Sequence, residues 1–168
     1  MEGEFREGHF DGVATIVQAF FEIVKPNNSY FGEKDFQQLQ IVKKMAEKEN
    51  LPVNVVGCAI YRENDGLAMS SRNARLTKEQ RAAAPLIYQI LNKANDLINS
   101  QKIKEIYTFV KEEFNKNNLL ELEYFTIAEE ESLLGVTFFE SDKKYRAFIA
   151  VNAGNVRLID NISLTINK

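Results

Sequence analysis

The N-terminal third of the chain alternates between apolar positions at helical spacing and short apolar runs. Spacings of three and four predict amphipathic helices over about residues 11–24 and 36–46. Apolar runs at residues 29–31 and 53–57 predict two short strands. The order helix, strand, helix, strand is typical of a parallel sheet with crossover helices. Because two strands are too few for a doubly wound sheet, we interpret this region as the later half of a Rossmann-like α/β domain.

The next region begins with a polar stretch and continues with two apolar helical faces. Residues 61–76 lack periodicity, which predicts a loop or hinge. Thr77 and Gln80 have the spacing of a capping box. Pro85 lies inside the helix that should follow, so we expect a kink near residues 81–82. The two apolar helical faces span residues 86–98 and 103–114.

The last part of the chain changes to a period of two, which predicts strands. The residues 152–155, Asn-Ala-Gly-Asn, are a plausible hairpin turn between the second and third of these strands. Two or three helices followed by a small antiparallel sheet make an α+β domain. We therefore predict a nucleotide-binding part over residues 1–72 and a second domain over residues 73–168. The positions expected to share a face are Leu120, Leu122, Tyr124, Thr126 and Ala128; Tyr145, Ala147, Ile149 and Val151; and Val156, Leu158, Asp160 and Ile162.

Composition and charge narrow the class of protein. The formal net charge of −3 gives no reason to expect attraction to nucleic acid or to a membrane surface. No apolar run is long enough for a membrane span, and the N-terminus lacks a signal-peptide apolar region. Cys58 is the single cysteine, so it cannot form an internal disulfide, and we expect it to be a small core residue. These features suit a reducing, cytoplasmic setting.

The first candidate site is the stretch 30–38, Tyr-Phe-Gly-Glu-Lys-Asp-Phe-Gln-Gln, where a strand end runs into a glycine and a helix start. A glycine lets a ligand approach the backbone, and free amides at a helix start favour an anion. Lys34 adds a positive charge for a phosphate, and Asp35 could accept hydrogen bonds from ribose hydroxyls. Gln37 and Gln38 cannot share a helix face, so at most one should reach a ligand easily. The alternative is a solvated first helical turn with acids at its start.

The second candidate site is the stretch 65–73, Asp-Gly-Leu-Ala-Met-Ser-Ser-Arg-Asn. Arg72 could pair with a phosphate in two-pronged fashion, and the hydroxyls of Ser70 and Ser71 could donate to the same anion. The alternative is a hinge rich in turn-forming residues. Met69 is more often a packing residue than a ligand contact.

The sequence gives little indication of histidine, metal or nucleophilic catalysis. His9 is the single histidine, and a lone histidine at a helix start is more often structural than catalytic. The sequence has no cluster with zinc-ligand spacing, no P-loop and no nucleophile elbow, so we assign no protein metal site.

Four segments together resemble the pantoate–β-alanine ligase family, and in the family's order they cover essentially the whole chain. They are residues 8–15 (GHFDGVAT), 31–38 (FGEKDFQQ), 65–73 (DGLAMSSRN) and 157–161 (RLIDN). The resemblance is to the C-terminal portion of such enzymes, so it implies part of a nucleotidyltransferase-type Rossmann-like domain followed by an α+β lid domain.

The resemblance implies an enzyme that uses ATP and Mg²⁺. The carboxylate of pantoate attacks ATP to give pantoyl adenylate and pyrophosphate, and the amine of β-alanine then displaces AMP. The small-molecule partners implied are pantoate, β-alanine and ATP, and the parent enzyme is expected to be a cytoplasmic homodimer.

The resemblance also assigns roles to residues. The expected ATP contacts are Gly32, Glu33, Lys34, Asp35, Tyr61 through its backbone, Met69, Ser70, Ser71 and Arg72. Lys34 and Arg72 are the expected catalytic residues, and Gln38 is expected to bind pantoate. Arg6 and His9 match family positions near the pocket and rank lower.

The chain departs from the family pattern in two ways. Glu7 stands where the family usually has proline, so we expect a less rigid entry to the first helix, and Asn64 stands where the family often has proline, a minor difference. Members also carry a preceding segment with the first strands and a His-x-Gly-His motif that grips ATP phosphates, and that motif does not occur here. We therefore expect a truncated chain with little or no ligase activity by itself. The competing interpretations are a non-catalytic interaction or dimerisation module and a standalone nucleotide-binding protein.

Overall fold

The computed structural model describes residue 3 and residues 8–166, and it separates into two compact units. Unit 1 comprises residues 1–60 and unit 2 comprises residues 61–168. The loop 61–72, which we assigned to the first domain, thus belongs to unit 2. The reason is physical, since the loop is hydrogen-bonded to the last strand, most closely through Arg62. Within the described ranges, no helix is both long and apolar enough to cross a membrane.

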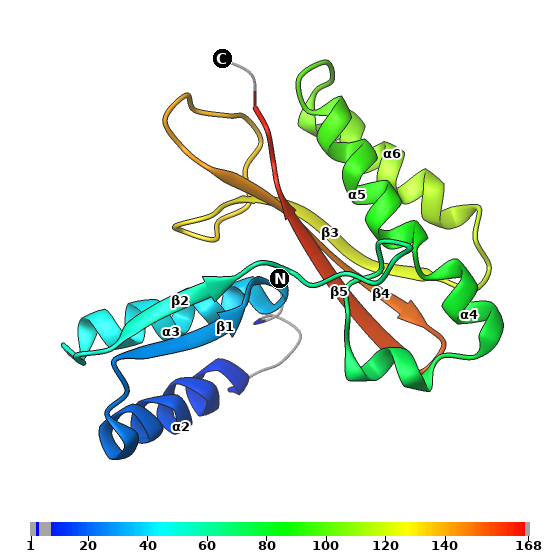
Figure 1. Ribbon diagram of the computed structural model, residues 1–168. Coiled ribbons are helices and arrows are strands. Elements are labelled where there is room, and N and C mark those ends of the chain that lie inside the picture. Colours follow the sequence, from blue (N-terminus) through cyan, green and yellow to red (C-terminus); the bar gives the residue numbers. More distant parts are fainter. Residues whose placement is uncertain (1–2, 4–7, 167–168) are drawn as a thin grey trace. The chain divides into compact units, whose positions relative to one another are not determined.

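Unit 1 has the predicted order of helix, strand, helix and strand (Figure 1). Strands β1 and β2 pair in parallel, with Phe31 opposite Gly57 and Gly32 opposite Cys58. A short 3₁₀ turn, η1, joins β1 to the second helix. The elements are α2 (His9–Val24), β1 (Asn28–Gly32), η1 (Glu33–Asp35), α3 (Phe36–Lys48) and β2 (Asn54–Cys58).

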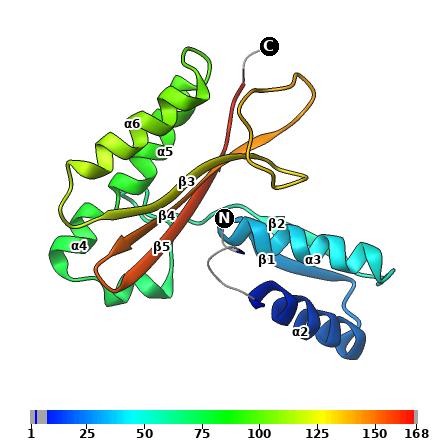
Figure 2. The same cartoon turned by 180° about the vertical axis from the view of Figure 1, so that it is seen from behind.

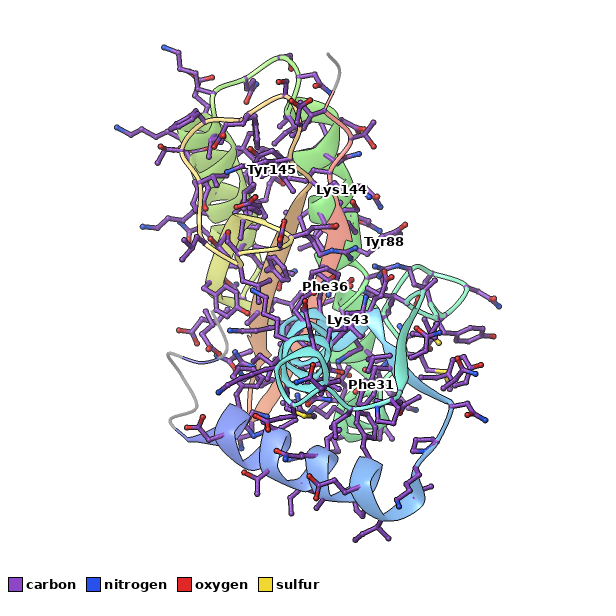
Figure 3. All side chains as sticks on the ribbon, turned by 90° about the vertical axis from the view of Figure 1, so that its left-hand side faces the viewer. Phe31, Phe36, Lys43, Tyr88, Lys144 and Tyr145 are labelled. Atoms are coloured by element: carbon purple, nitrogen blue, oxygen red, sulfur yellow. The ribbon has the colours of Figure 1, made fainter. Side chains whose placement is uncertain are left out.

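The helices of unit 1 pack on one face of this small sheet. Phe21 on α2, Val42 on α3 and Phe31 on β1 belong to one apolar cluster. The rings of Phe21 and Phe31 meet edge-on with centroids 6.5 Å apart, and Figure 3 labels Phe31. Tyr30 points to the opposite face of the strand and is 67% exposed. Cys58 is also exposed at the end of β2, so our expectation of a buried cysteine was wrong, because the apolar run of β2 ends just before it.

Unit 2 is an antiparallel sheet with strand order β3-β4-β5, covered on one face by two helices (Figure 2). Its large apolar core includes Leu91 on α5, Ile106 on α6 and Ile149 on β4. Figure 3 labels Tyr145 at the start of β4, whose ring lies 4.9 Å from that of Phe139. The elements are η2 (Ser71–Arg75), α4 (Lys78–Ala83), α5 (Leu86–Leu97), α6 (Ile103–Asn115), β3 (Glu121–Glu129), β4 (Tyr145–Ala153) and β5 (Val156–Ser163).

Two turn predictions in unit 2 are confirmed. The Thr77 side chain accepts from the Gln80 N–H while the Gln80 side chain accepts from the Thr77 N–H, which completes the capping box. Ala153 pairs with Val156 across a two-residue hairpin, and Gly154 has the positive φ of 58° that such a turn requires.

Two other predictions in unit 2 need correction. Pro85 does not kink one helix near residues 81–82; it separates α4 from α5 and occupies the N-cap of α5. Its ring and missing N–H are tolerated there but not inside a helix. The alternation along β3 also shifts, because a bulge at Glu123 lies between the pairs Leu122–Val151 and Tyr124–Ala150. Odd-numbered residues such as Phe125 therefore face the core after the bulge.

Candidate functional site

The first motif lies at the carboxyl edge of the parallel strands of unit 1. β1 ends at Gly32, η1 carries the three charged residues 33–35, and α3 begins at Phe36. Because β1 and β2 are parallel and in register, both strands end at this edge. Ligands in open α/β sheets bind at the carboxyl ends of the strands, so the motif occupies the position where such a site is expected.

Gly32 is a glycine that the described structure does not itself require. Its φ of −69° and ψ of 132° are open to any residue. A Cβ added there would meet no atom within 4 Å. Gly57 differs, because a Cβ there would lie 2.9 Å from Leu39 Cδ2. Gly57 is therefore explained by packing, whereas the open space beside Gly32 leaves room for a ligand to approach the backbone.

The charged turn that follows carries cationic and anionic groups together. The Nζ atom of Lys34 lies 3.9 Å from Oδ2 of Asp35, at the limit of an ion pair. The Lys34 side chain is only 16% exposed, whereas that of Asp35 is 54% exposed. Asp35 is the N-cap residue of α3 but its side chain makes no capping hydrogen bond. The Asp35 carboxylate can therefore accept from another group, as a ribose contact would need.

The other described candidate residues of unit 1 lie at the starts of α2 and α3. Gln37 and Gln38 are both half-buried in the first turn of α3. Gln37 Oε1 is buried without a hydrogen-bond partner in the described part of the chain. His9 is the first residue of α2, and its ring lies 5.1 Å from that of Phe10. Arg6 lies outside the described residues. Pantoate binding by Gln38 stays a prediction.

The second motif is held at the end of a small hairpin in unit 2. The Met69 N–H donates to the Tyr61 carbonyl at 2.9 Å, and the Glu63 N–H donates to the Leu67 carbonyl at 2.9 Å. The side chains of Tyr61 and Met69 are exposed. The sequence did not predict this hairpin, because its two strands are too short to show a period-two alternation of apolar and polar residues.

Ser70, Ser71 and Arg72 follow directly and form the start of η2. Ser70 Oγ accepts from the Arg72 N–H at 3.2 Å, so its own proton remains for donation. Arg72 Nη1 donates to the Arg157 carbonyl at 3.4 Å, a long bond. Most N–H groups of the Arg72 guanidinium are thus unengaged within the described ranges. This arrangement can receive an anion such as a phosphate.

Fixed charges surround the base of this loop. Arg81 donates to Oε2 of Glu63 and to Oδ2 of Asp65, both at 2.6 Å. The Asn73 amide and then Arg81 lower the pKa of Glu63, and the hydrogen bond from Arg81 lowers the pKa of Asp65. The same partners, Asp65 first, raise the pKa of Arg81. All three groups are therefore charged at neutral pH and hold the loop against α4.

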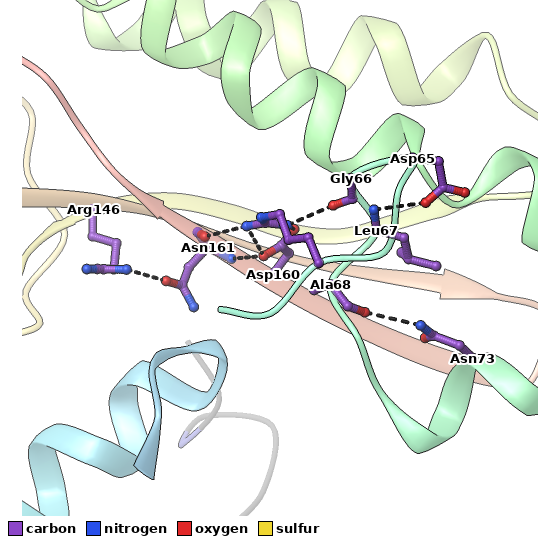
Figure 4. Close-up of polar contacts among 9 residues, drawn as sticks. Asp65, Gly66, Leu67, Ala68, Asn73, Arg146, Asp160 and Asn161 are labelled. Atoms are coloured by element: carbon purple, nitrogen blue, oxygen red, sulfur yellow. Dashed lines mark hydrogen bonds and ion pairs between the residues drawn. The ribbon is translucent and has the colours of Figure 1, made fainter. Parts of the chain in front are cut away.

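Sequence reasoning missed a second set of polar residues beneath the loop. Arg62 forms a two-pronged ion pair with Asp160 of β5, which Figure 4 labels, with distances of 2.6 and 2.9 Å. Asp160 is 4% exposed. One signal was present in the sequence, because Asp160 occupies a core-facing position in the period-two run of β5. A carboxylate at such a position requires a buried partner.

Lys34 belongs to unit 1 and Arg72 to unit 2. The two motifs therefore form two candidate surfaces, one on each unit. Surface hollows in unit 2, one lined by parts of α6 and β3 and another by residues near Arg146, include neither motif. No group of three or more metal-ligating side chains occurs in the part of the chain that the structure describes.

The fold and the positions of the motifs define the class as a mixed α/β protein, with one polar motif at the carboxyl edge of the parallel sheet of unit 1 and the other on a loop of unit 2. A family model described as pantoate-beta-alanine ligase matches residues 1–163. The chain belongs to the pantoate-beta-alanine ligase family, as the motifs predicted.

Similar proteins carry the same description. The pantothenate synthetase of Christiangramia forsetii is 51% identical over 164 residues, which cover 98% of this chain and 58% of that protein. The pantothenate synthetase of Flavobacterium psychrophilum is also 51% identical with the same coverage. The chain therefore spans less than two thirds of the length of these relatives.

Solved structures agree with the fold. A pantothenate synthetase from Thermus thermophilus matches with a TM-score of 0.89 and 37% identity, over 96% of this chain and 58% of that one. A pantoate-beta-alanine ligase from Francisella tularensis, complexed with beta-gamma ATP and beta-alanine, matches with a TM-score of 0.71 and 32% identity, over 97% of this chain and 53% of that one. The predicted fold class is confirmed, whereas the roles of individual residues stay predictions.

Proposed function

We propose that this chain is the C-terminal part of an ATP-dependent ligase that joins pantoate to β-alanine. In the first step a carboxylate oxygen of pantoate bonds to the α-phosphorus of ATP, and pyrophosphate leaves. In the second step the amine of β-alanine bonds to the acyl carbon of pantoyl adenylate, AMP leaves, and the amine loses a proton. The observation that carries the proposal is the family match across both polar motifs, each of which lies on a loop or strand end with groups suited to an anion.

Unit 1 supplies the nucleotide-facing strand end in this proposal. Gly32 lets ATP approach the protein backbone closely, Lys34 neutralises phosphate charge, and Asp35 accepts hydrogen bonds from ribose hydroxyls. Glu33 lies over the end of β2, with Oε1 3.2 Å from where a Cβ of Gly57 would be, and is proposed to contact ATP from there. Gln38 is proposed to donate to pantoate, and Arg6 and His9 are lower-ranked candidates for positions near the pocket.

Unit 2 supplies the phosphate-contacting loop. The Ser70 and Ser71 hydroxyls donate to phosphate oxygens, and Arg72 stabilises the charge that develops as pyrophosphate leaves. The exposed Met69 side chain and the Tyr61 backbone are proposed to contact the adenosine part of ATP. Positioning two substrates and stabilising charge is sufficient for such a reaction without a covalent enzyme intermediate.

Mg²⁺ enters this proposal with ATP. Mg²⁺ keeps several waters and is commonly held by one or two carboxylates together with substrate phosphates. The donor set of the charged turn, with Asp35 exposed and unused as a cap, fits one such carboxylate. We also propose a cytoplasmic homodimer for the complete enzyme, testable by sedimentation of the protein with its natural length.

A fusion experiment tests the proposed function. The 168-residue chain replaces the matching part of the Christiangramia forsetii relative, and pantothenate formation is measured with pantoate, β-alanine and MgATP. We expect the fusion to be active, the separate chain to be inactive, and Lys34→Ala to abolish most activity of the fusion. Lys43→Ala, an exposed lysine further along α3, is the matched control and should leave the rate unchanged. An inactive fusion that is folded, or equal effects of both lysine variants, would refute the assignment.

A non-catalytic interaction module is the alternative from another class of function. It predicts that the fusion binds no MgATP and that neither Lys34 nor Arg72 affects its behaviour. Calorimetry with MgATP on the same fusion separates the two possibilities.

A further inference from the structure

The guanidinium of Arg62 donates hydrogen bonds to Gly66, Asp160 and Asn161, which Figure 4 labels. Nη1 donates to Asp160 Oδ2 at 2.6 Å and to the Gly66 carbonyl at 3.0 Å. Nη2 donates to Asp160 Oδ1 at 2.9 Å and to the Asn161 carbonyl at 3.3 Å. These contacts engage the N–H groups of both terminal nitrogens, so Arg62 has no terminal donor left for a phosphate.

A tyrosine ring completes the enclosure. The guanidinium carbon of Arg62 lies 3.7 Å from the centroid of the Tyr88 ring on α5, a cation–π contact. The same ring also lies against the tip of the loop, since a Cβ on Gly66 would be 2.5 Å from Tyr88 Cδ1. Gly66 also has a φ of 91°, which side-chain-bearing residues rarely adopt. We call Arg62, Asp160, Tyr88 and Gly66 the Arg62 cluster.

Backbone bonds connect the Arg62 cluster to the phosphate-contacting loop. Arg62 and Ala68 form an antiparallel bridge pair, and the Tyr61 carbonyl accepts from the Met69 N–H. The Ala68 carbonyl accepts from the Asn73 side chain at 3.1 Å, as Figure 4 also shows. Fixing Arg62 therefore fixes the backbone on both sides of Ser70, Ser71 and Arg72.

Arg62 and Arg72 thus have opposite environments within a single loop. Arg62 pairs with a carboxylate that is almost completely buried, whereas Arg72 makes one long bond to a carbonyl. We propose that Arg62 is a positioning residue, which rests on the proposed function. It holds the loop in the form in which Ser70, Ser71 and Arg72 meet the phosphates of ATP, and it does not itself touch the nucleotide.

Four variants separate positioning from general stability. Arg62→Lys keeps the charge opposite Asp160 but loses the two-pronged pair and the planar stack. Tyr88→Leu removes the ring, while Tyr88→Phe keeps it. Arg157→Lys is the matched control, because the Arg157 side chain on β5 also makes a two-pronged pair with a carboxylate, through Nε and Nη2 to Glu123 of β3.

Hydrogen exchange on the 168-residue chain gives the first readout. Arg62→Lys and Tyr88→Leu should speed amide exchange of residues 63–72 roughly three- to thirtyfold, the range of a cation–π contact. Tyr88→Phe and Arg157→Lys should leave it unchanged. Unchanged exchange in Arg62→Lys and Tyr88→Leu, or an equal increase in Arg157→Lys, would overturn the role of Arg62. This readout does not depend on ligase activity.

Kinetics of the fusion give the second readout. Loss of positioning should raise the KM for ATP in Arg62→Lys and Tyr88→Leu, whereas a purely structural defect would lower the active fraction and leave KM unchanged. A wild-type fusion without activity would contradict the proposed function, while the exchange result would still decide whether Arg62 holds the loop. Altered exchange with an unchanged KM would overturn the link to ATP.

Discussion

The two units of this chain differ in how completely each buries its apolar residues. Unit 2 packs two helices on one face of its antiparallel sheet, and in the core between them Leu91, Ile106 and Ile149 are fully buried. Unit 1 has a two-stranded parallel sheet and leaves Tyr30 exposed on the uncovered face. The helix α2 also exposes apolar side chains, namely Ile16, Phe20, Ile23 and Val24.

The difference in buried apolar area bears on the stability of each unit. Parallel sheets normally have both faces covered, and two strands are rarely stable by themselves. We infer that unit 2 is a self-sufficient folding unit, whereas unit 1 requires another protein surface to reach full stability. Each candidate motif therefore lies on a different kind of support: the serine–arginine loop on the unit with the larger apolar core, and the charged turn on the unit with the smaller one.

The largest expected effect comes from truncating the core of unit 2. Leu91→Ala should lower the unfolding free energy of unit 2 by about 2–5 kcal/mol, because it leaves a cavity in a fully buried site. Phe20→Ala on α2 should change stability by less than about 0.5 kcal/mol, because that side chain is largely exposed. Urea unfolding of both variants measures the difference. Equal losses would contradict the contrast between the units.

Two glycines provide the next comparison. Gly66→Ala should destabilise unit 2 by roughly 1–3 kcal/mol, since it forces a positive φ on alanine and displaces Tyr88. Gly32→Ala in unit 1 should leave stability unchanged, since its Cβ would enter open space, yet it should raise the KM for ATP in the fusion. Thermal unfolding and steady-state kinetics check the pair. A stability loss in Gly32→Ala would show that packing, not a ligand, explains that glycine.

A smaller effect depends on pH. The Asn73 amide and then Arg81 depress the pKa of Glu63, and Arg81 depresses the pKa of Asp65, so the stabilisation from both carboxylates is present at neutral pH and is lost as pH falls through the carboxyl range. Arg81→Gln should therefore lower the thermal midpoint at pH 7 and differ less from wild type below about pH 4. A difference that is constant from pH 7 to pH 3 would exclude these ion pairs as its cause.

The smallest effect on stability is expected on the exposed face of α2. Ile23→Gln should leave the unfolding free energy unchanged but reduce self-association of the chain, because it interrupts a run of exposed apolar side chains. Leu134→Gln, at an exposed leucine of unit 2, is the control and should not alter association. Light scattering across protein concentrations measures the self-association of both variants. Equal self-association would count against a role of the exposed apolar face of α2 in association.

Most elements of the fold could be predicted because their signals are local. Helical spacing identified α2 and α3, and the period of two identified β4 and β5. The bulge at Glu123 could not be foreseen, because the one-residue shift depends on the partner strand and on Arg157, which donates to that carboxylate. The exposure of Cys58 likewise depends on where β2 ends.

The candidate site was predictable only in part. The charged turn and the serine–arginine loop were found because each is a contiguous segment. The pair between Arg62 and Asp160 joins residues 98 positions apart, and no local pattern connects them. A core-facing acid in β5 was the available hint, but its partner could be named only from the folded chain.

The central claim is that the two units differ in independent stability, and urea titration of the 168-residue chain followed by amide NMR tests it most directly. We expect the signals of α2, α3 and the parallel strands to disappear at lower urea concentration than those of β4 and the helices that cover it. A single shared transition, with unit 1 and unit 2 lost at the same urea concentration, would contradict the account.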